Sequence, residues 1–90
     1  MAKVKIPTPL RKFTNNESEI TVEGSTVKEL IENLEKSYPG IKKRLCDESG
    51  GIRKFINIYV GEDDIRFLKK EETELKKDSE VNIVPAIAGG

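Results

Sequence analysis

One segment near the middle of the chain spaces its apolar residues as an amphipathic helix does. It begins at Thr26-x-x-Glu29, the capping-box pattern in which two side chains satisfy backbone N–H groups of the first turn. Pro39-Gly40 ends it, because proline cannot continue a helix. The expected apolar stripe is Val27, Leu30, Ile31, Leu34 and Tyr38. A helix with one stripe needs one partner surface, so the rest of the chain must supply a layer for it to cover.

Five shorter segments carry the alternation or β-branched enrichment of strands. They are Lys3 to Ile6, Ser18 to Val22, Phe55 to Val60, a short one at Ile65 to Leu68, and Val81 to Ile87. The first two are expected to form a hairpin with a long connection, because Pro7 ends the first and Asn15-Asn16 lies between them. The order strand, strand, helix, strand, short strand, strand predicts a two-layer α+β domain with one mixed sheet.

Length and charge exclude several kinds of partner. Ninety residues make a single domain, 1–90, with a modest core and no deep cavity. Sixteen Lys and Arg balance sixteen Asp and Glu, so no net field attracts nucleic acid or an anionic membrane. No apolar run approaches the ~20 residues of a membrane span, and Met1 to Lys5 lacks the apolar stretch of a secretory signal. We therefore expect a cytoplasmic protein, monomeric on its own.

The chain has no histidine and one cysteine, Cys46, which leaves few ways to build a catalytic site. Ser-His and Cys-His pairs, an intrachain disulfide and an ordinary zinc site are excluded. Cys46 closes a short helical turn that begins at Ile41, and we expect a partly buried thiol, with a sulfur-relay role as the alternative. Glu62-Asp63-Asp64 is typical of a solvated turn. The sequence thus predicts no catalytic residue, no metal site and no bound cofactor.

The end of the printed sequence, a tail over about 85–90, has a chemical use. Gly89 and Gly90 have no Cβ, so they can thread a narrow channel and present the carboxylate of Gly90 unshielded. The predicted strand from Val81 leads into this tail and would project it from a rigid support. The alternative is a frayed polar terminus or an expression scar.

Three stretches carry a family resemblance. Phe55 to Phe67, Ile83 to Gly90 and an early Ile6-Pro7-Thr8 resemble the MoaD/ThiS family of ubiquitin-like sulfur carriers, and within it the carriers of cysteine biosynthesis. The resemblance covers essentially the whole chain. It implies a β-grasp fold, in which one face of a mixed sheet is covered by one main helix.

The resemblance also implies a carrier and not an enzyme. In that family a separate adenylating enzyme uses ATP to attach AMP to the terminal carboxylate, which is that of Gly90 here. A sulfur donor then displaces AMP and leaves a thiocarboxylate, which a sulfur-acceptor enzyme such as a cysteine synthase uses. ATP is thus expected as the partner's substrate, and Gly89 and Ala88 as the reach into the partner sites.

A docking surface is predicted from the strand alternation. The residues expected to face the helix are Val4, Ile6, Ile56, Ile58, Val60, Val81 and Ile83. Because side chains alternate along a strand, Phe55, Tyr59 and Val84 then lie on the opposite face, where an exposed aromatic and aliphatic cluster is typical of an interface. The alternative is that the two faces are reversed or that a loop covers these residues.

Three other functions remain open at this point. The chain is compatible with the small subunit of molybdopterin synthase, which would remain bound to a large subunit. It is also compatible with a ubiquitin-like modifier, in which the Gly90 carboxylate forms an isopeptide bond with a lysine. A third possibility is a binding module that uses only the sheet face.

Overall fold

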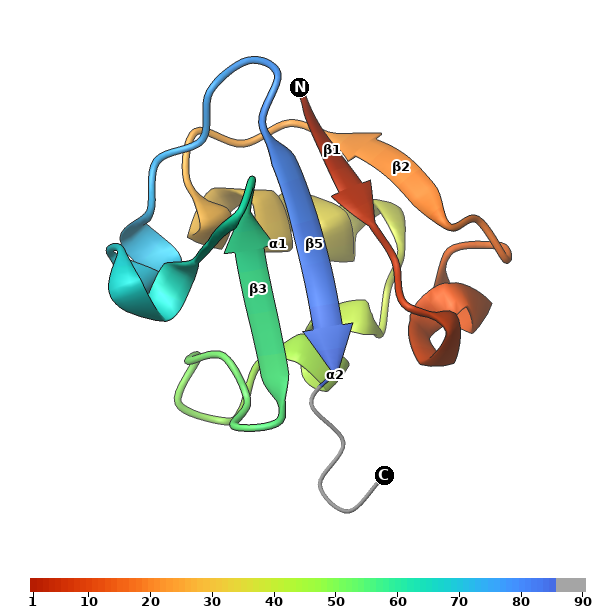
Figure 1. Cartoon of the computed structure of the whole chain (residues 1–90). Coiled ribbons are helices and arrows are strands. Elements are labelled where there is room, and N and C mark those ends of the chain that lie inside the picture. The colour runs from red at the N-terminus through yellow and green to blue at the C-terminus, as the bar shows by residue number, and fades with distance from the viewer. Residues whose placement is uncertain (86–90) are drawn as a thin grey trace.

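A computed structural model describes residues 1–85, which form one mixed sheet with two helices against one of its faces (Figure 1). The strands are β1 (Ala2–Lys5), β2 (Glu19–Val22), β3 (Ile56–Val60), β4 (Asp63–Asp64) and β5 (Glu80–Pro85). Their order in the sheet is β2-β1-β5-β3-β4, and only the β1–β5 pair is parallel. The predicted two-layer α+β architecture and the β1–β2 hairpin are confirmed.

Helix α1 (Val27–Ser37) forms where the apolar spacing predicts it. The Thr26 hydroxyl accepts a hydrogen bond from the backbone N–H of Glu29 at 3.1 Å, and the Glu29 carboxylate accepts one from the backbone N–H of Ser25 at 3.3 Å. The first bond satisfies an N–H group that the first turn of the helix leaves free, and the second ties the Glu29 side chain to the residue before the N-cap. The side chains of α1 that are buried against the sheet are Val27, Leu30, Ile31 and Leu34.

A tight junction joins α1 to the short helix α2 (Ile41–Leu45). Gly40 has φ +101°, and a Cβ added there would lie 3.3 Å from the ring of Phe13, so a larger residue would be strained on both counts. The Glu35 carboxylate accepts hydrogen bonds from the backbone N–H groups of Gly40 and Lys42. These two bonds hold the pKa of Glu35 below its usual value. Glu35 therefore fixes the turn that brings α2 under the sheet.

The core lies between the sheet and the helices. Val4, Ile58 and Val81 are buried beneath α1, as the alternation predicts. Ile56 and Val60 are partly buried and pack at the margin of the same cluster. The helix-facing set predicted from sequence is therefore on the helix side, and its remaining members, Ile6 and Ile83, are also buried.

The segment after β3 differs from the prediction of a short strand at Ile65 to Leu68, which is wrong. Those residues begin with a 3-10 helix, η2 (Ile65–Phe67), and the short strand is β4, which pairs with β3 just before it. Asp64 is the cause, because its carboxylate accepts the backbone N–H of Arg66 at 2.9 Å and caps the turn. Asp64 is only 7% exposed, so the acidic triplet is also not wholly a solvated turn.

Two more 3-10 helices lie in the connections: η1 (Thr8–Phe13) within the β1–β2 hairpin and η3 (Lys70–Glu72) before β5. Asn15 and Asn16 both adopt positive φ in the hairpin loop, where asparagine is tolerated. β5 extends to Pro85, and the predicted continuation of this strand over Ala86 and Ile87 lies outside the described residues.

The Asp64–Arg66 pair predicts a pH-dependent contribution to stability. The guanidinium of Arg66, 2.9 Å from the Asp64 carboxylate, is the main cause that lowers the pKa of Asp64, and the Arg66 backbone N–H adds to it. Because the folded pKa lies below the unfolded value of about 3.9, this contribution is present above about pH 4 and is lost as pH falls through the folded pKa.

We therefore expect Asp64→Asn to lower the free energy of unfolding by about 0.5–1 kcal/mol at neutral pH, since the Arg66 side chain is largely exposed to solvent. The difference from the wild type should shrink in acid, measured by urea unfolding at both pH values. Asp63→Asn, at the exposed neighbouring position, is the control and should change little. An equal loss at both pH values would show that the charge of Asp64 is not what stabilises the turn.

Candidate functional site: the outer sheet face and the end of β5

The strand that precedes the tail is held on both sides. β5 lies between β1 and β3, and its last residue, Pro85, pairs with Ile56. The chain is therefore supported up to the residue at which the description ends. Ala88, Gly89 and Gly90, the tail positions predicted from sequence, lie outside the described residues.

The structure brings together the three residues predicted to form a docking surface. Asn57 pairs with Val84 across β3 and β5. Tyr59 lies two residues from Asn57 along β3, so it is a diagonal neighbour of Val84 on the same face. Phe55 lies in the turn just before β3 and lines a groove together with Pro85, the residue after Val84. Phe55 is 58% exposed, Val84 is 41% exposed and Tyr59 is half-buried. We call Phe55, Tyr59 and Val84 the outer patch; its place on the face away from α1 matches the expected alternation, and its docking role stays a prediction.

Polar groups border the outer patch on both sides. Tyr59 pairs with Asp64 across β3 and β4, which places the Asp64–Arg66 pair beside it. On the other side Asn82 pairs with Lys5 of β1. Protein-binding surfaces typically have an apolar centre surrounded by polar and charged residues.

Sequence reasoning missed an exposed apolar residue at the edge of the sheet. Phe67 is 84% exposed and Leu68 is 45% exposed, both at the end of η2. In the predicted strand at Ile65 to Leu68, the neighbouring side chains of Phe67 and Leu68 would point to opposite faces of the sheet. The prediction therefore did not indicate that both are exposed. An aspartate that can accept the backbone N–H two residues later indicates a turn, and Asp64 with Arg66 fits this pattern.

Cys46 lies in the core and not on an exposed surface where a partner could reach it. It is 6% exposed at the end of α2, and burial raises the pKa of its thiol. A raised pKa keeps the thiol protonated at neutral pH, which disfavours a nucleophilic role. The thiol is more buried than the sequence suggested.

Neither a metal centre nor a membrane segment is found among residues 1–85. No group of three or more Asp, Glu or Cys side chains in this part of the chain is arranged to hold a metal ion. In the same part, neither helix has the length and apolarity needed to cross a bilayer. Among the sites predicted from sequence, the outer patch and the supported end of β5 are those that this region presents for function.

These features define a class of protein: a ubiquitin-like β-grasp domain with its last strand in the middle of the sheet. The model of the ThiS family matches residues 4–90, and the chain belongs to this family. The match runs through the tail, so it includes residues 86–90, which the structure does not describe.

Individual relatives agree with the family. The chain is 40% identical over 89 residues to the sulfur carrier protein CysO of Mycobacterium tuberculosis, covering 97% of this chain and 96% of that protein. Its fold matches the CysO/BexX complex structure from Amycolatopsis orientalis with a TM-score of 0.94 and 41% identity over 100% of both chains. It also matches the small archaeal modifier protein 1 of Methanosarcina acetivorans, with a TM-score of 0.83 and 30% identity, over 99% of this chain and 95% of the other.

Proposed function

We propose that this protein is a sulfur carrier for cysteine biosynthesis and carries sulfur as a thiocarboxylate on Gly90. The observation that carries the proposal is the 40% identity, over nearly the full length of both chains, to a protein named as a sulfur carrier. The match of the family through residue 90, which includes Gly89-Gly90, supports the assignment of the reactive position.

The chemistry follows from the low reactivity of a carboxylate. Its negative charge and resonance make the carbonyl carbon a poor electrophile. An oxygen of the Gly90 carboxylate attacks the α-phosphorus of ATP, pyrophosphate leaves, and a mixed anhydride with AMP forms. A sulfide donor then attacks the carbonyl carbon, AMP leaves with the bridging oxygen, and a thiocarboxylate remains. No oxidant or reductant is consumed if the donor supplies sulfur as sulfide.

In this proposal the protein is a cosubstrate, and the catalytic groups belong to its partners. The adenylating enzyme binds ATP, and the sulfur acceptor is an enzyme of the cysteine-synthase type. The carrier contributes the slim tail at Ala88 and Gly89 and a surface that partners recognise. It binds no cofactor of its own, and we expect it to act in the cytoplasm as a monomer between encounters.

The proposal is tested by incubating the protein with ATP and candidate adenylating enzymes of its source organism and following AMP and pyrophosphate release. With the cognate enzyme and a sulfide source, release should depend on this protein and should stop when it is fully loaded. Transfer is then followed with a cysteine-synthase-type enzyme and an activated serine, which should give a cysteinyl adduct at Gly90. Transfer to a pterin precursor alone would assign the protein to molybdopterin synthesis.

The outer patch gives a second measurable expectation. Val84→Arg should raise the KM for the carrier in the adenylation assay by about tenfold, because a charge at the centre of an apolar contact must be desolvated. Thr21→Arg, at an exposed β-branched position on the same sheet face but on the edge strand β2, is the matched control and should change KM less than about twofold. Equal KM values would remove the outer patch from the docking surface, and unfolding of Val84→Arg alone would mean that Val84 is a core residue.

A second candidate function is protein modification, which the fold match to a protein named as a modifier favours. A modifier uses the same activated carbonyl but transfers it to the amine of a lysine. The products differ: an isopeptide conjugate is a larger protein that resists thiol reagents, whereas the carrier returns at its original mass after sulfur transfer. Conjugates without a thiocarboxylate intermediate would favour this alternative.

A further inference from the structure

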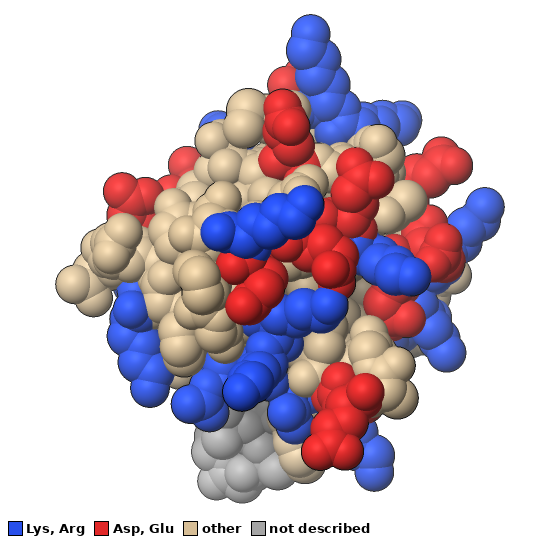
Figure 2. Space-filling view, turned by 180° about the vertical axis from the view of Figure 1, so that it is seen from behind, with Lys and Arg blue, Asp and Glu red and all other residues tan. Residues whose placement is uncertain are grey.

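The charges of this neutral protein are divided between two ends. Residues 8–13 and 41–55, which comprise η1, α2 and the loop into β3, contain seven Lys and Arg against two Asp and Glu, a net charge of +5. The rest of the chain therefore carries −5. Both segments lie at the end of the sheet where β5 finishes (Figure 1). Viewed from behind, Lys and Arg side chains gather around this lower end of the molecule, and most Asp and Glu side chains lie above them (Figure 2).

Specific contacts bring these cations together. The Arg44 guanidinium lies 5.7 Å and the Lys12 ammonium 5.5 Å from the centre of the Phe13 ring. The Nε–H of Arg53 donates to the carbonyl of Lys43 at 2.8 Å, which fixes Arg53 against α2. We define the basic rim as the five exposed members of this group: Lys12, Lys43, Arg44, Arg53 and Lys54.

The basic rim reaches the base of the tail. A single groove is lined by three rim residues and by residues at the start of β3 and the end of β5; its lining is Arg44, Asp47, Arg53, Lys54, Phe55, Ile56 and Pro85. Phe55 belongs to the outer patch, so the rim and the patch form one continuous surface. Pro85 is the last described residue, so this surface borders the point from which the tail continues.

Contacts with the Phe13 ring and with the Lys43 carbonyl hold parts of the rim in place, but ion pairs do not neutralise it. Within residues 1–85 the ion pairs are Lys42–Glu32 and Arg66–Asp64, and neither includes a rim residue. Neighbouring positive charges that lack ion-pair partners repel one another and disfavour the folded state slightly. A cluster of positive charges that no ion pair among residues 1–85 neutralises, that borders the end of β5 and that adjoins the outer patch is best explained by a partner of opposite charge.

We propose that the basic rim docks against an acidic protein surface at the mouth of the channel that receives the tail in the adenylating enzyme. The proposal rests on the proposed function, since it assumes that the tail enters such a channel. A compact acidic patch can contact this end alone. A long polyanion such as RNA would also approach the remaining surface, which carries −5 and repels it.

Screening explains why the two ends act separately. The domain measures 31 × 27 × 24 Å. The Debye length at physiological ionic strength is about 8 Å, so the negative end does not cancel the field of the rim at the tail. The separated charges orient the protein during encounter so that the basic rim faces an acidic surface. This orientation raises the association rate and makes the rate depend on salt.

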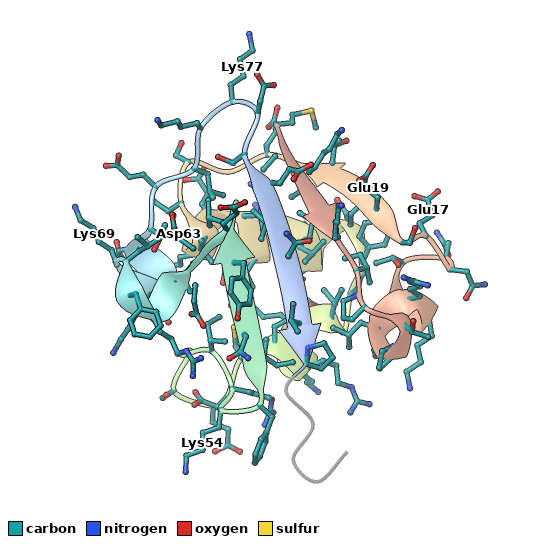
Figure 3. The ribbon with its side chains drawn as sticks, in the orientation of Figure 1. Glu17, Glu19, Lys54, Asp63, Lys69 and Lys77 are labelled. Carbon is teal, nitrogen blue, oxygen red and sulfur yellow. The ribbon has the colours of Figure 1, made fainter. Side chains whose placement is uncertain are left out.

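The test compares two double charge reversals that change the net charge equally. Lys43→Glu with Lys54→Glu alters the rim, and Lys69→Glu with Lys77→Glu alters exposed lysines elsewhere; Figure 3 shows Lys54 at the tail end, Lys77 at the opposite end and Lys69 at the side of the sheet. None of the four side chains makes a hydrogen bond or ion pair with another described residue. Melting curves first establish that both variants are folded.

Adenylation kinetics at low and high salt then provide the result. The rim variant should lose about tenfold or more in kcat/KM at low salt with kcat unchanged, and should approach the wild type at high salt. The distal variant should stay within about twofold throughout. Equal kcat/KM for the two variants, with the wild type active, would overturn the basic rim as a docking surface while leaving the sulfur-carrier function intact. Absence of AMP formation with the wild type would instead refute the function, and the docking proposal with it.

A parallel arm tests the other anionic partner. Fluorescence anisotropy with a labelled single-stranded RNA of mixed sequence measures binding at physiological salt, and no specific binding is expected. If the wild type binds this RNA tightly, the rim variant loses that binding and its kcat/KM remains unchanged, the rim is a nucleic-acid site and the proposal is wrong.

Discussion

Deletion of Gly90, or addition of one alanine after it, is expected to abolish sulfur loading. Only a terminal carboxylate can react with ATP at this position, and deletion of Gly90 moves that carboxylate one residue back, out of reach of the reactive phosphate. A displacement of this order misplaces the reacting atoms by more than the tolerance of an adenylating site, which is about 1 Å for a large loss of rate. The measurement is the fraction of protein loaded after incubation with the cognate enzyme, ATP and sulfide.

Two controls separate this effect from others. An alanine added before Met1 changes the mass equally, at the end of the sheet away from the tail, and should leave loading unchanged. Removing Gly89 and Gly90 together should leave the melting temperature nearly unchanged, so that loss of loading is not loss of fold. Loading of the chain extended at Gly90 would contradict the assignment of the reactive atom.

Leu34→Ala is expected to lower the free energy of unfolding by about 2–5 kcal/mol. The Leu34 side chain of α1 is fully buried in the core. Its truncation to alanine therefore leaves a cavity that the surrounding helix and sheet residues do not fill. Urea unfolding monitored by circular dichroism measures the change. Leu68→Ala is the matched control, because Leu68 is 45% exposed, and should change stability by less than about 0.5 kcal/mol. Similar losses for both variants would mean that Leu34 does not anchor the core.

The parts of the fold that were predictable depend on strong local signals. The apolar stripe of α1 and its Thr26 cap fix the helix within a residue or two, because periodicity and capping agree there. Strand alternation gave the correct faces for Ile58 and Val84, since a shift of one residue would have moved the whole apolar set into solvent. The family resemblance then ordered these elements into the β-grasp arrangement.

The parts that were not predictable depend on contacts between neighbours in space. A short strand was predicted at Ile65 to Leu68, but the Asp64 cap and its bond to Arg66 turn the chain there instead. The basic rim was hidden for another reason. A net charge of zero suggests an even surface, whereas folding brings Lys12 of η1 beside Arg44 of α2, more than thirty residues away.

The central claim is that Gly90 carries sulfur, and intact-protein mass spectrometry tests it most directly. After incubation with the cognate adenylating enzyme, ATP and a sulfide source, the protein should gain the mass of one oxygen replaced by sulfur, and fragmentation should locate the change at Gly90. Omission of ATP should prevent it. An unchanged mass at Gly90 while AMP is released, or a sulfur atom located at Cys46, would contradict the account.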